Sequence, residues 1–434
     1  MPRPLPIAVP TRRRFLRSTL AAGLTLAAAP MAFGRARRVG PNDRITFGVI
    51  GVGIQGRGLA VRMARRPDAQ VVAVADVVDI RRDDAKARIE KATADRDGSA
   101  SHTGCDVYHD FRELLARDDL DAVIIATPDH WHAIPCVMAA DAKKHIYCEK
   151  PLTHNIAQGR TIVDAVARNG ITFQTGSQQR SPGEFSGNFP RAVELVWNGR
   201  IGEVKTIRVG VGGPPKPVDL AEEPVPEGTD WDFWVGPAAF HPYNEILCPK
   251  GVHDHFPDWR GYAPYGNGGI ADMGAHHFDI AQWALKKHES GPVSIIPPEG
   301  DDTSGLRFVY DDGVEMIHGG PDDCTFEGTE GIIRVGRSKF ETEPESLAGP
   351  LPEGAERVDA EGDHYDNFLA AIRGEARPVA PAEVGHRTAS VCHLGVIGYT
   401  LRRPLTWDPD AERFVDDDEA NALRTEEYRR PWSL

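Results

Sequence analysis

The sequence lacks several features that would assign it to a common class of protein. Its six cysteines, at positions 105, 136, 148, 248, 324 and 392, form no C-x-x-C pair, so neither a zinc ribbon nor a thioredoxin-like site is expected. Positive charge is not in excess either. The formal net charge is −14, which argues against nucleic acid or an anionic membrane surface as a partner. The sequence also has no internal repeat and no H-E-x-x-H pattern of a zinc protease.

Long apolar runs near the N-terminus are also missing. Residues 11–18 read TRRRFLRS, a twin-arginine export pattern, and a modestly apolar stretch over residues 20–29 follows. That stretch is shorter than the roughly 20 residues needed to span a bilayer, and no cysteine stands near the small-residue site at 32–34 to carry a lipid anchor. We expect residues 1–34 to be a twin-arginine signal peptide read by the export machinery, and the protein to be periplasmic without a membrane anchor. The alternative is a basic, alanine-rich disordered tail.

The strongest pattern present is ITFGVIGVGIQGRG over residues 45–58. It begins with a β-branched apolar run that is typical of a buried strand. The glycines that follow have the spacing G-x-G-x-x-G. In dinucleotide-binding turns this spacing allows the tight turn, the close approach of the pyrophosphate, and the packing of the next helix. The pyrophosphate would lie on the N-terminus of that helix. The predicted cofactor-binding residues of the turn are Gly51, Gly53, Ile54, Gln55 and Gly56.

A second strand over residues 70–75 supports this reading, because Asp76 at its end lies twenty residues after Gly56. A carboxylate at this place binds the ribose hydroxyls of NAD and repels the 2′-phosphate of NADP. We therefore expect NAD as the cofactor, with NADP possible because Arg81 and Arg82 stand near. The alternative is an ordinary βαβ turn with a solvated aspartate.

Strand and helix patterns alternate over residues 43–178, which predicts a parallel sheet with helices on both faces. The expected strands cover residues 45–50, 70–75, 122–126, 145–148 and 171–175, with a short one near Val107, and the expected helices cover residues 80–92, 131–142 and 156–169. We predict an α/β protein whose first domain is a Rossmann doubly wound parallel sheet.

The pattern changes after residue 178. Strands are expected over residues 204–211, 305–310, 314–318 and 331–335, with a hairpin turn at 311–313, and helices over residues 363–373 and 383–401. This predicts a second domain, residues 179–405, of the α+β class with a largely antiparallel open sheet. A charged C-terminal tail, residues 406–434, is expected to follow it.

Polar residues follow the fourth and fifth strands, where such sheets bind their ligands. Thr127, Pro128, His130 and His132 should border the cofactor, although a capping or packing role suits either histidine equally well.

Glu149 and Lys150 end the fifth strand and are also assigned to the cofactor site. An ammonium group there would face the nicotinamide and could help to remove the proton of a substrate hydroxyl. The alternative is a surface lysine.

Residues 266–283 read GNGGIADMGAHHFDIAQW, which predicts a helix beginning near Ile270. Asp272 and His276 are four residues apart and should share one helical face, whereas His277 points about 100° away. A carboxylate one turn from an imidazole can orient it and raise its basicity, as a general base requires. The alternative is a helix-surface pair.

The sequence His253-Asp254-His255, together with the histidines of this helix and Asp279, permits a metal-dependent hydrolase as a rival interpretation. We predict no metal site, because the presence of these residues can also be explained without a metal.

These residues together resemble the Gfo/Idh/MocA oxidoreductase family, named for glucose–fructose oxidoreductase and inositol dehydrogenase. The resemblance covers roughly residues 43–405. It rests on the dinucleotide fingerprint, on the sequence Glu-Lys-Pro at residues 149–151, and on Asp272 with His276. Residues 231–237 (WDFWVGP) and 268–283 look like the exported bacterial branch of the family.

The resemblance implies a site in the cleft between two domains. Lys150 and His276 would be the catalytic pair, with Asp272 assisting. The implied substrate-binding residues are Arg180, Trp259, Arg260 and His277. A dimer or tetramer is implied by analogy with the family.

The expected reaction is hydride transfer from a secondary alcohol of a sugar, cyclitol or glycoside to NAD, which would be tightly bound and recycled in place. Two alternatives remain open: an NAD-dependent glycosidase or lyase that works through transient oxidation, and a non-catalytic sugar-binding protein that holds NAD.

Overall fold

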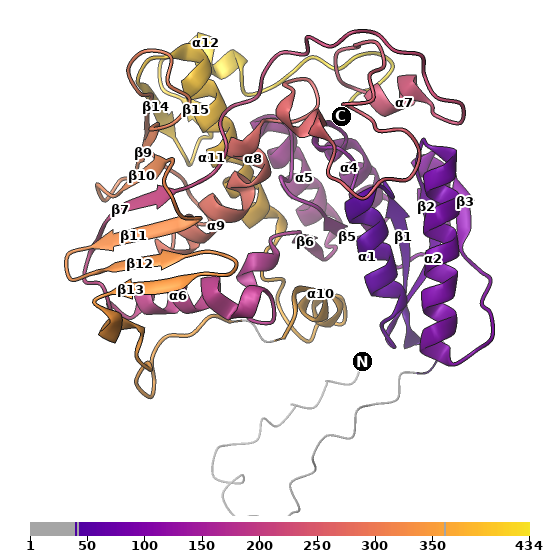
Figure 1. The fold of residues 1–434 in the computed structure, drawn as a ribbon, viewed down its shortest axis with the longest axis horizontal. Coiled ribbons are helices and arrows are strands. Elements are labelled where there is room, and N and C mark those ends of the chain that lie inside the picture. The colour runs from indigo at the N-terminus through magenta and orange to yellow at the C-terminus, as the bar shows by residue number, and fades with distance from the viewer. Residues whose placement is uncertain (1–39, 41–42, 360–361) are drawn as a thin grey trace, which may run out of the picture. The chain divides into compact units, whose positions relative to one another are not determined.

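The computed structural model describes residue 40, residues 43–359 and residues 362–434. The predicted signal peptide, residues 1–34, lies outside the described residues. From Asp43 to Leu434 the chain forms a single unit built on two sheets (Figure 1). None of the helices in the described part is long and apolar enough to cross a membrane.

The first sheet has six strands in the order β3-β2-β1-β4-β5-β6, and neighbouring strands pair in parallel throughout. This is the strand order of doubly wound dinucleotide-binding folds, so the predicted fold class is confirmed. The strands are β1 (Ile45–Ile50), β2 (Ala69–Ala75), β3 (Asp106–Tyr108), β4 (Ala122–Ile125), β5 (His145–Cys148) and β6 (Phe173–Thr175). The helices between them are α1 (Ile54–Ala64), α2 (Asp79–Asp97), α3 (Phe111–Leu115), α4 (Ala133–Asp141) and α5 (Ile156–Asn169).

The second sheet has nine strands in the order β13-β12-β11-β7-β10-β9-β8-β14-β15. Only β7 and β10 pair in parallel among the pairings described, so the predicted antiparallel character is confirmed. The strands are β7 (Val204–Val209), β8 (Ser294–Ile296), β9 (Arg307–Val309), β10 (Glu315–His318), β11 (Cys324–Gly328), β12 (Ile332–Val335), β13 (Phe340–Glu343), β14 (Leu405–Asp408) and β15 (Arg413–Phe414).

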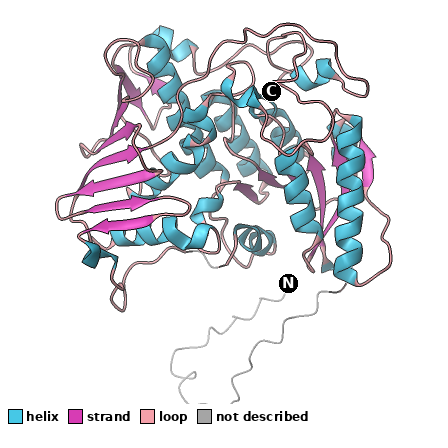
Figure 2. Cartoon of the chain, viewed as in Figure 1, coloured by secondary structure: helices cyan, strands magenta, loops and turns pink. Residues whose placement is uncertain are grey.

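Three helices cover one face of this sheet (Figure 2). They are α6 (Asn188–Trp197), α9 (Gly274–Ala284) and α11 (Ala382–Leu401). Phe278 of α9 packs edge-on against Phe308 of β9, with ring centroids 5.5 Å apart. Along β10 and β12, buried residues alternate with half-buried ones. This pattern is typical of a sheet with one covered face and one open face.

Two parts of the second half depart from the predicted domain limits. α10 (His364–Ile372) packs against the first sheet, where Phe368 meets Phe47 and Tyr147. The segment predicted as a tail forms β15, α12 (Asp418–Ala422) and all of β14 except its first residue. β14 pairs with β8. α11 also contacts α5, so the two sheets share one body of helices (Figure 1).

A long connection, residues 210–268, joins β7 to α8 (Gly269–Asp272) and contains the short helix α7 (Trp231–Val235). The helix predicted from Ile270 onward is two helices, α8 and α9, separated at Met273. Residues 178–180, which follow β6, form a single 3₁₀ turn.

Candidate functional site

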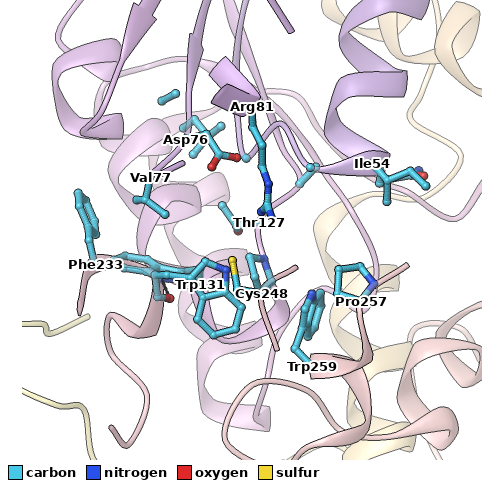
Figure 3. A pocket seen from close by; sticks show the side chains of 18 of the residues that line it. Ile54, Asp76, Val77, Arg81, Thr127, Trp131, Phe233, Cys248, Pro257 and Trp259 are labelled. Carbon is cyan, nitrogen blue, oxygen red and sulfur yellow. Dashed lines mark hydrogen bonds between the residues drawn. The ribbon is translucent and has the colours of Figure 1, made fainter. Parts of the chain in front are cut away.

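A cavity lies at the carboxyl ends of the first sheet's strands, which is where ligands of such sheets bind (Figure 3). Its empty volume is about 860 Å³ including the open mouth. It is lined by nine of the residues predicted from sequence: Gly51, Gly53, Ile54, Gln55, Asp76, Thr127, Pro128, Trp259 and Arg260.

The glycine turn has the geometry that a dinucleotide needs. Gly51 has φ +81°, a conformation that favours glycine. A Cβ on Gly56 would lie 1.8 Å from the Gly51 carbonyl oxygen, so only glycine lets α1 pack this closely. A Cβ on Gly53 would meet nothing within 4 Å. The space beside Gly53, at the N-terminus of α1, is therefore open to a pyrophosphate.

Asp76 ties this turn to the end of β2. Its carboxylate accepts the Val52 N–H at 2.8 Å and the Val78 N–H at 2.9 Å. Each carboxylate oxygen can accept a further hydrogen bond, which is the capacity that ribose hydroxyls use.

Thr127 supplies an unpaired polar atom in the cavity wall. Its Oγ1 is buried and has no hydrogen-bond partner in the described structure. Buried polar groups are rarely left unpaired, so this hydroxyl fits a bound cofactor.

His130 and His132 lie behind the wall rather than in it. The His130 ring is within hydrogen-bonding distance of the Trp234 carbonyl at 3.1 Å, and the His132 ring of the Thr127 and Pro151 carbonyls at 2.9 and 2.8 Å. Burial lowers the pKa of His130 to about 3 and that of His132 to about 4. Both rings are therefore neutral, and each connects neighbouring loops through its contacts with backbone carbonyls.

The opposite side of the cavity is closed by a segment of the long connection, residues 228–260, which we call the cover segment. In Figure 3, Asp76 and Arg81 face Cys248 and Trp259 of this segment across the cavity. The cover segment is anchored at β2 by the Asp230 N–H, which donates to the Val77 carbonyl at 3.0 Å. Its other lining residues are Phe233, Trp234, Leu247, Pro249, His253, Pro257 and Arg260.

The C-terminus holds the cover segment in place. Arg429 donates to the Gly236 carbonyl at 2.9 Å and pairs with Asp232 at 2.6 Å. Trp432 stacks on Phe233 of α7 with ring centroids 5.4 Å apart, and meets Trp131 edge-on at 4.7 Å. The last residues therefore tie α7 to the first domain.

Lys150 and Asp272 form the ionic centre of the site. Lys150 Nζ donates to Asp272 Oδ1 at 2.6 Å and to the Asp272 carbonyl at 2.9 Å. Arg260 Nε lies 3.5 Å from the same Oδ1. Although burial alone would raise it, the pKa of Asp272 is lowered by Lys150 and then by Arg260. Since Arg260 also lines the cavity, it connects this centre to the predicted cofactor site.

The break at Met273 explains why Asp272 faces Lys150. The His276 N–H donates to the Met273 carbonyl at 3.0 Å, and the Asp272 carbonyl accepts the ammonium group. The expectation that Asp272 orients the His276 imidazole is therefore wrong: no hydrogen bond joins the two side chains in the described structure, and Asp272 positions Lys150 instead.

His276 is buried, and its Nδ1 has no hydrogen-bond partner in the described structure. Burial, followed by the charges of Lys150 and Arg337, lowers its pKa well below the usual value. The Gln179 side-chain amide lies beside this group: with its nitrogen turned towards α9, the amide donates to the His276 carbonyl and accepts from Arg337 Nε, both at 3.2 Å. The neutral imidazole of His276 can thus accept a hydrogen bond.

His277 lies on the other side of α9. Its Nε2 is 3.5 Å from Asp323 Oδ2, and its ring stacks on Phe189. Burial lowers its pKa to about 4.

The structure does not bear out a substrate contact by Arg180. Its guanidinium pairs with Asp279 through two hydrogen bonds of 2.6 and 2.7 Å, with both side chains almost fully buried. Thr388 also donates to Asp279, at 2.8 Å. Arg180 and Asp279 therefore join the second domain's helices to the turn after β6, away from the cavity.

Glu149 is buried beside the cavity. It accepts from Gln55 at 2.9 Å and from Gln178 at 3.0 Å, and burial raises its pKa. It therefore positions Gln55 of the glycine turn.

The histidines considered for a metal lie apart in the structure. His253 and Asp254 are in the cover segment, in a loop rather than a strand, and Asp254 pairs with Arg57 at 2.5 Å. No group of three or more His, Cys, Asp or Glu within the described residues is arranged to hold a metal ion.

Sequence reasoning missed Arg337 and Asp129. Arg337 follows β12 and reaches the site only because the second sheet folds beside α9. Asp129 stands within the stretch singled out after the fourth strand, directly before His130, and this position is the only local signal for it.

The fold and this site are those of a dinucleotide-binding protein with two sheets. Two sequence models of one family match the chain: "Oxidoreductase family, NAD-binding Rossmann fold" over residues 45–177 and "Oxidoreductase family, C-terminal alpha/beta domain" over residues 216–434. The chain belongs to the Gfo/Idh/MocA oxidoreductase family, and its first domain is the NAD-binding Rossmann fold of that family.

Named relatives match mainly one part of the chain. A myo-inositol 2-dehydrogenase of Thermotoga maritima is 31% identical over 176 residues, which is 40% of this chain and 47% of that protein. A 2,7-anhydro-N-acetylneuraminate hydratase of Escherichia coli is 29% identical over 160 residues, which is 37% of this chain and 38% of that protein. In three curated relatives, the matched part is 38% to 47% of the relative's own length.

A solved structure shows the same fold over most of the chain. The WlbA dehydrogenase of Bordetella pertussis, in complex with NADH and UDP-GlcNAcA, superposes with a TM-score of 0.57 at 18% identity. The superposition covers 84% of this chain and 99% of that one.

Proposed function

We propose that this protein oxidises a secondary alcohol of a sugar, cyclitol or glycoside and transfers the hydride to NAD. The observation that carries the proposal is the ion pair of Lys150 with Asp272 at 2.6 Å, beside the cavity whose wall contains the glycine turn and Asp76. The name of the inositol dehydrogenase relative supports a polyol as the substrate class.

NAD, when bound, supplies the acceptor for the hydride. The residues of the chain handle the hydroxyl group. Lys150 uses two hydrogen bonds on Asp272, and an ammonium group has three donors. The remaining donor can hold the substrate oxygen and stabilise negative charge on it as the hydrogen leaves the carbon. His276 is neutral and can hold the same hydroxyl from the second domain.

Arg337 and Arg260 are the proposed substrate-facing cations. Arg337 is exposed and stacks on Phe185 at 4.8 Å, and Arg260 stacks on Trp259 at 4.2 Å. Their guanidinium groups suit hydroxyl or carboxylate oxygens. His277 and Arg180 are not included, because their ring and guanidinium groups face Asp323 and Asp279.

NAD is favoured over NADP because both nearby arginines are engaged. Arg81 donates to the Gly251 carbonyl at 3.0 Å and to that of Pro249, and Arg82 pairs with Asp79. Asp76 remains at the ribose position. Titration of the purified protein with both dinucleotides tests this, and tighter binding of NADP would contradict it.

The contacts of the cover segment support the proposal that the cofactor is held tightly and recycled in place. It walls the cavity with aromatic side chains and is anchored at β2 and by the C-terminus. The experiment is to wash the protein extensively and assay it without added NAD. If washing removes all dinucleotide and only stoichiometric NAD restores activity, recycling is ruled out.

A second candidate is elimination or hydrolysis through transient oxidation, since removal of a hydride makes the neighbouring C–H acidic. The hydratase among the relatives favours it. The presence of Lys150 favours net oxidoreduction over elimination or hydrolysis. Product analysis with a glycoside separates the two, because only the first reaction releases an oxidised sugar.

We also propose export by the twin-arginine route to the periplasm, from the TRRRFLRS motif. Replacing Arg12 and Arg13 together by lysine should keep the protein in the cytoplasm. An oligomer, dimer or tetramer, through the open face of the second sheet is proposed by analogy with the family, and sedimentation analysis tests it.

A further inference from the structure

A second cavity is lined by residues of the loop after Lys150, the long connection, α11 and the C-terminal segment. Its empty volume is about 1250 Å³ including open solvent. Among the described residues, none lines both this cavity and the one at the glycine turn. The apolar part of its wall contains Pro214, Pro215, Val396 and Ile397. The proposed oxidation uses none of these side chains.

Two buried histidines of this cavity each have a ring nitrogen without a partner. His154, in the loop after Lys150, is 3% exposed, and His393 of α11 is 4% exposed. Both residues line the cavity, and the buried Nε2 of each has no hydrogen-bond partner in the part of the chain that the structure describes. Since buried polar atoms are rarely left unpaired, these two nitrogens fit a bound ligand.

The ring of His154 is held in place by its neighbours. Its Nδ1 is 2.9 Å from Glu426 Oε2. Its backbone N–H donates to Gln158 Oε1 at 3.0 Å, and its carbonyl accepts from Asn267 Nδ2 at 2.8 Å. Nε2 is therefore the ring nitrogen of His154 that is left for a ligand, and little side-chain freedom is lost when the ligand binds.

The charges around the cavity favour a neutral ligand. Any positive charge on His154 is balanced by the Glu426 carboxylate beside it. Arg402, which also lines the cavity, donates to the Asp302 carbonyl at 2.6 Å and to the Gly300 carbonyl at 3.3 Å. Burial lowers the pKa of His393 to about 3, so its ring is neutral. A carboxylate or phosphate would therefore meet Glu426 with no free cationic partner among the described lining residues.

Hydroxyl groups match the polar atoms of this wall. The Nε2 of an imidazole donates or accepts according to its protonation, and a hydroxyl group can do either. The half-exposed Glu426 carboxylate can accept from a further hydroxyl. The proline and aliphatic side chains offer contacts to C–H groups. A ring that carries several hydroxyl groups on an apolar C–H skeleton satisfies both parts of the wall.

We propose that this cavity is a second binding site, which takes a neutral sugar or cyclitol beside His154, His393 and Glu426. The site stands apart from the proposed oxidation, because it shares no lining residue with the cofactor cavity within the described part of the chain. It is nevertheless joined to the catalytic loops. His154 lies four residues after Lys150, and Asn267, whose amide binds the His154 carbonyl, lies five residues before Asp272.

The test is equilibrium dialysis of the NAD-loaded protein against radiolabelled glucose and, separately, myo-inositol. Thr400 is an exposed residue of α11 that lines the cavity, so Thr400→Trp fills the cavity from the surface. His393→Leu removes one of the two imidazoles. Thr161→Trp is the matched control, because the Thr161 and Thr400 hydroxyls each donate to the carbonyl four residues earlier in a helix.

We expect the wild-type chain and Thr161→Trp to bind at least one of the two sugars equally well. Thr400→Trp should lose one equivalent of that sugar, and His393→Leu should bind it at least about tenfold more weakly at this site. Thermal unfolding shows whether each variant is folded, and Glu426→Gln replaces His393→Leu if that variant is not. If neither sugar has a site that both variants weaken, the second site is ruled out.

A crystal structure of the NAD-bound protein soaked with the tighter-binding sugar gives the location. Sugar density within hydrogen-bonding distance of Nε2 of both His154 and His393 would support the proposal. Sugar density only beside Lys150, or ordered water alone at the two histidines, would overturn it. A chain that binds sugar in this cavity but oxidises no polyol would contradict the proposed function and leave the second site standing.

Discussion

At the scale of single residues, Lys150 is the group on which the proposed chemistry depends. Lys150→Ala should lower kcat at least about a hundredfold, because the donor to the substrate oxygen is lost, while NAD still binds. The measurement is steady-state turnover together with dinucleotide titration. Lys205→Ala, an exposed lysine of β7, is the control and should behave as wild type. Near-normal turnover in Lys150→Ala would count against the assignment.

Two glycines of one turn separate cofactor binding from stability. Gly53→Ala places a methyl group in open space and should leave the midpoint of thermal unfolding unchanged while weakening NAD binding, since the pyrophosphate lies there. Gly56→Ala places it against the Gly51 carbonyl and should lower the unfolding midpoint. Calorimetry and NAD titration of both variants measure this. Equal loss of stability in the two would contradict the proposed roles.

The residues predicted from sequence are those whose role depends on local chain order. The glycine turn, Asp76 and Lys150 lie at strand ends, so the order of strands brings them together. Arg180 was assigned wrongly because its partner Asp279 lies 99 positions along the chain. Arg337 was missed for the same reason: nothing near it in sequence shows which element it will face.

At the scale of elements, the cover segment and the C-terminus should control the release of the cofactor. Trp432→Ala removes the ring that stacks on Phe233 and should speed NAD dissociation, because α7 loses a contact that fixes it. Leu434→Ala, at an exposed residue of the same segment, is the matched control. The measurement is the dinucleotide retained after gel filtration. Equal retention by the two variants would show that the C-terminus does not hold the cover.

The elements themselves differ in how far sequence predicts them. Each strand of the first sheet was expected, and all but the short β3 are mainly buried. In the second sheet, β7, β9, β10 and β12 were expected, whereas β8, β11, β13, β14 and β15 were not. The break at Met273 was missed because helical periodicity continues through it; at the break, Lys150 Nζ donates to the Asp272 carbonyl.

At the scale of the whole molecule, buried neutral histidines should make the fold sensitive to acid. Burial lowers the pKa of His130 and His393 to about 3, and of His132 and His364 to about 4. Below pH ~6.5 the unfolded chain binds protons that the folded chain does not, so the free energy of unfolding falls by up to about 1.4 kcal/mol per pH unit for each histidine. This stability is present above pH ~6.5 and is lost as the pH falls towards 4.

Urea unfolding at pH 7 and pH 5 measures the effect. His364→Asn should lower the free energy of unfolding at pH 7 and also reduce its dependence on pH, because one of the four groups is gone. A free energy of unfolding that stays constant or rises between pH 7 and pH 5 would contradict this account.

The central claim is that the chain carries NAD and reduces it with a polyol held at Lys150. The most direct measurement is to purify the protein without added cofactor, identify by mass spectrometry the dinucleotide released on denaturation, and add a panel of sugars and cyclitols to the native protein while following the absorbance of reduced nicotinamide. The account predicts bound NAD, and an absorbance change equivalent to that NAD with at least one polyol, which Lys150→Ala does not show. Absence of bound dinucleotide together with no change for any polyol after NAD is added would contradict it.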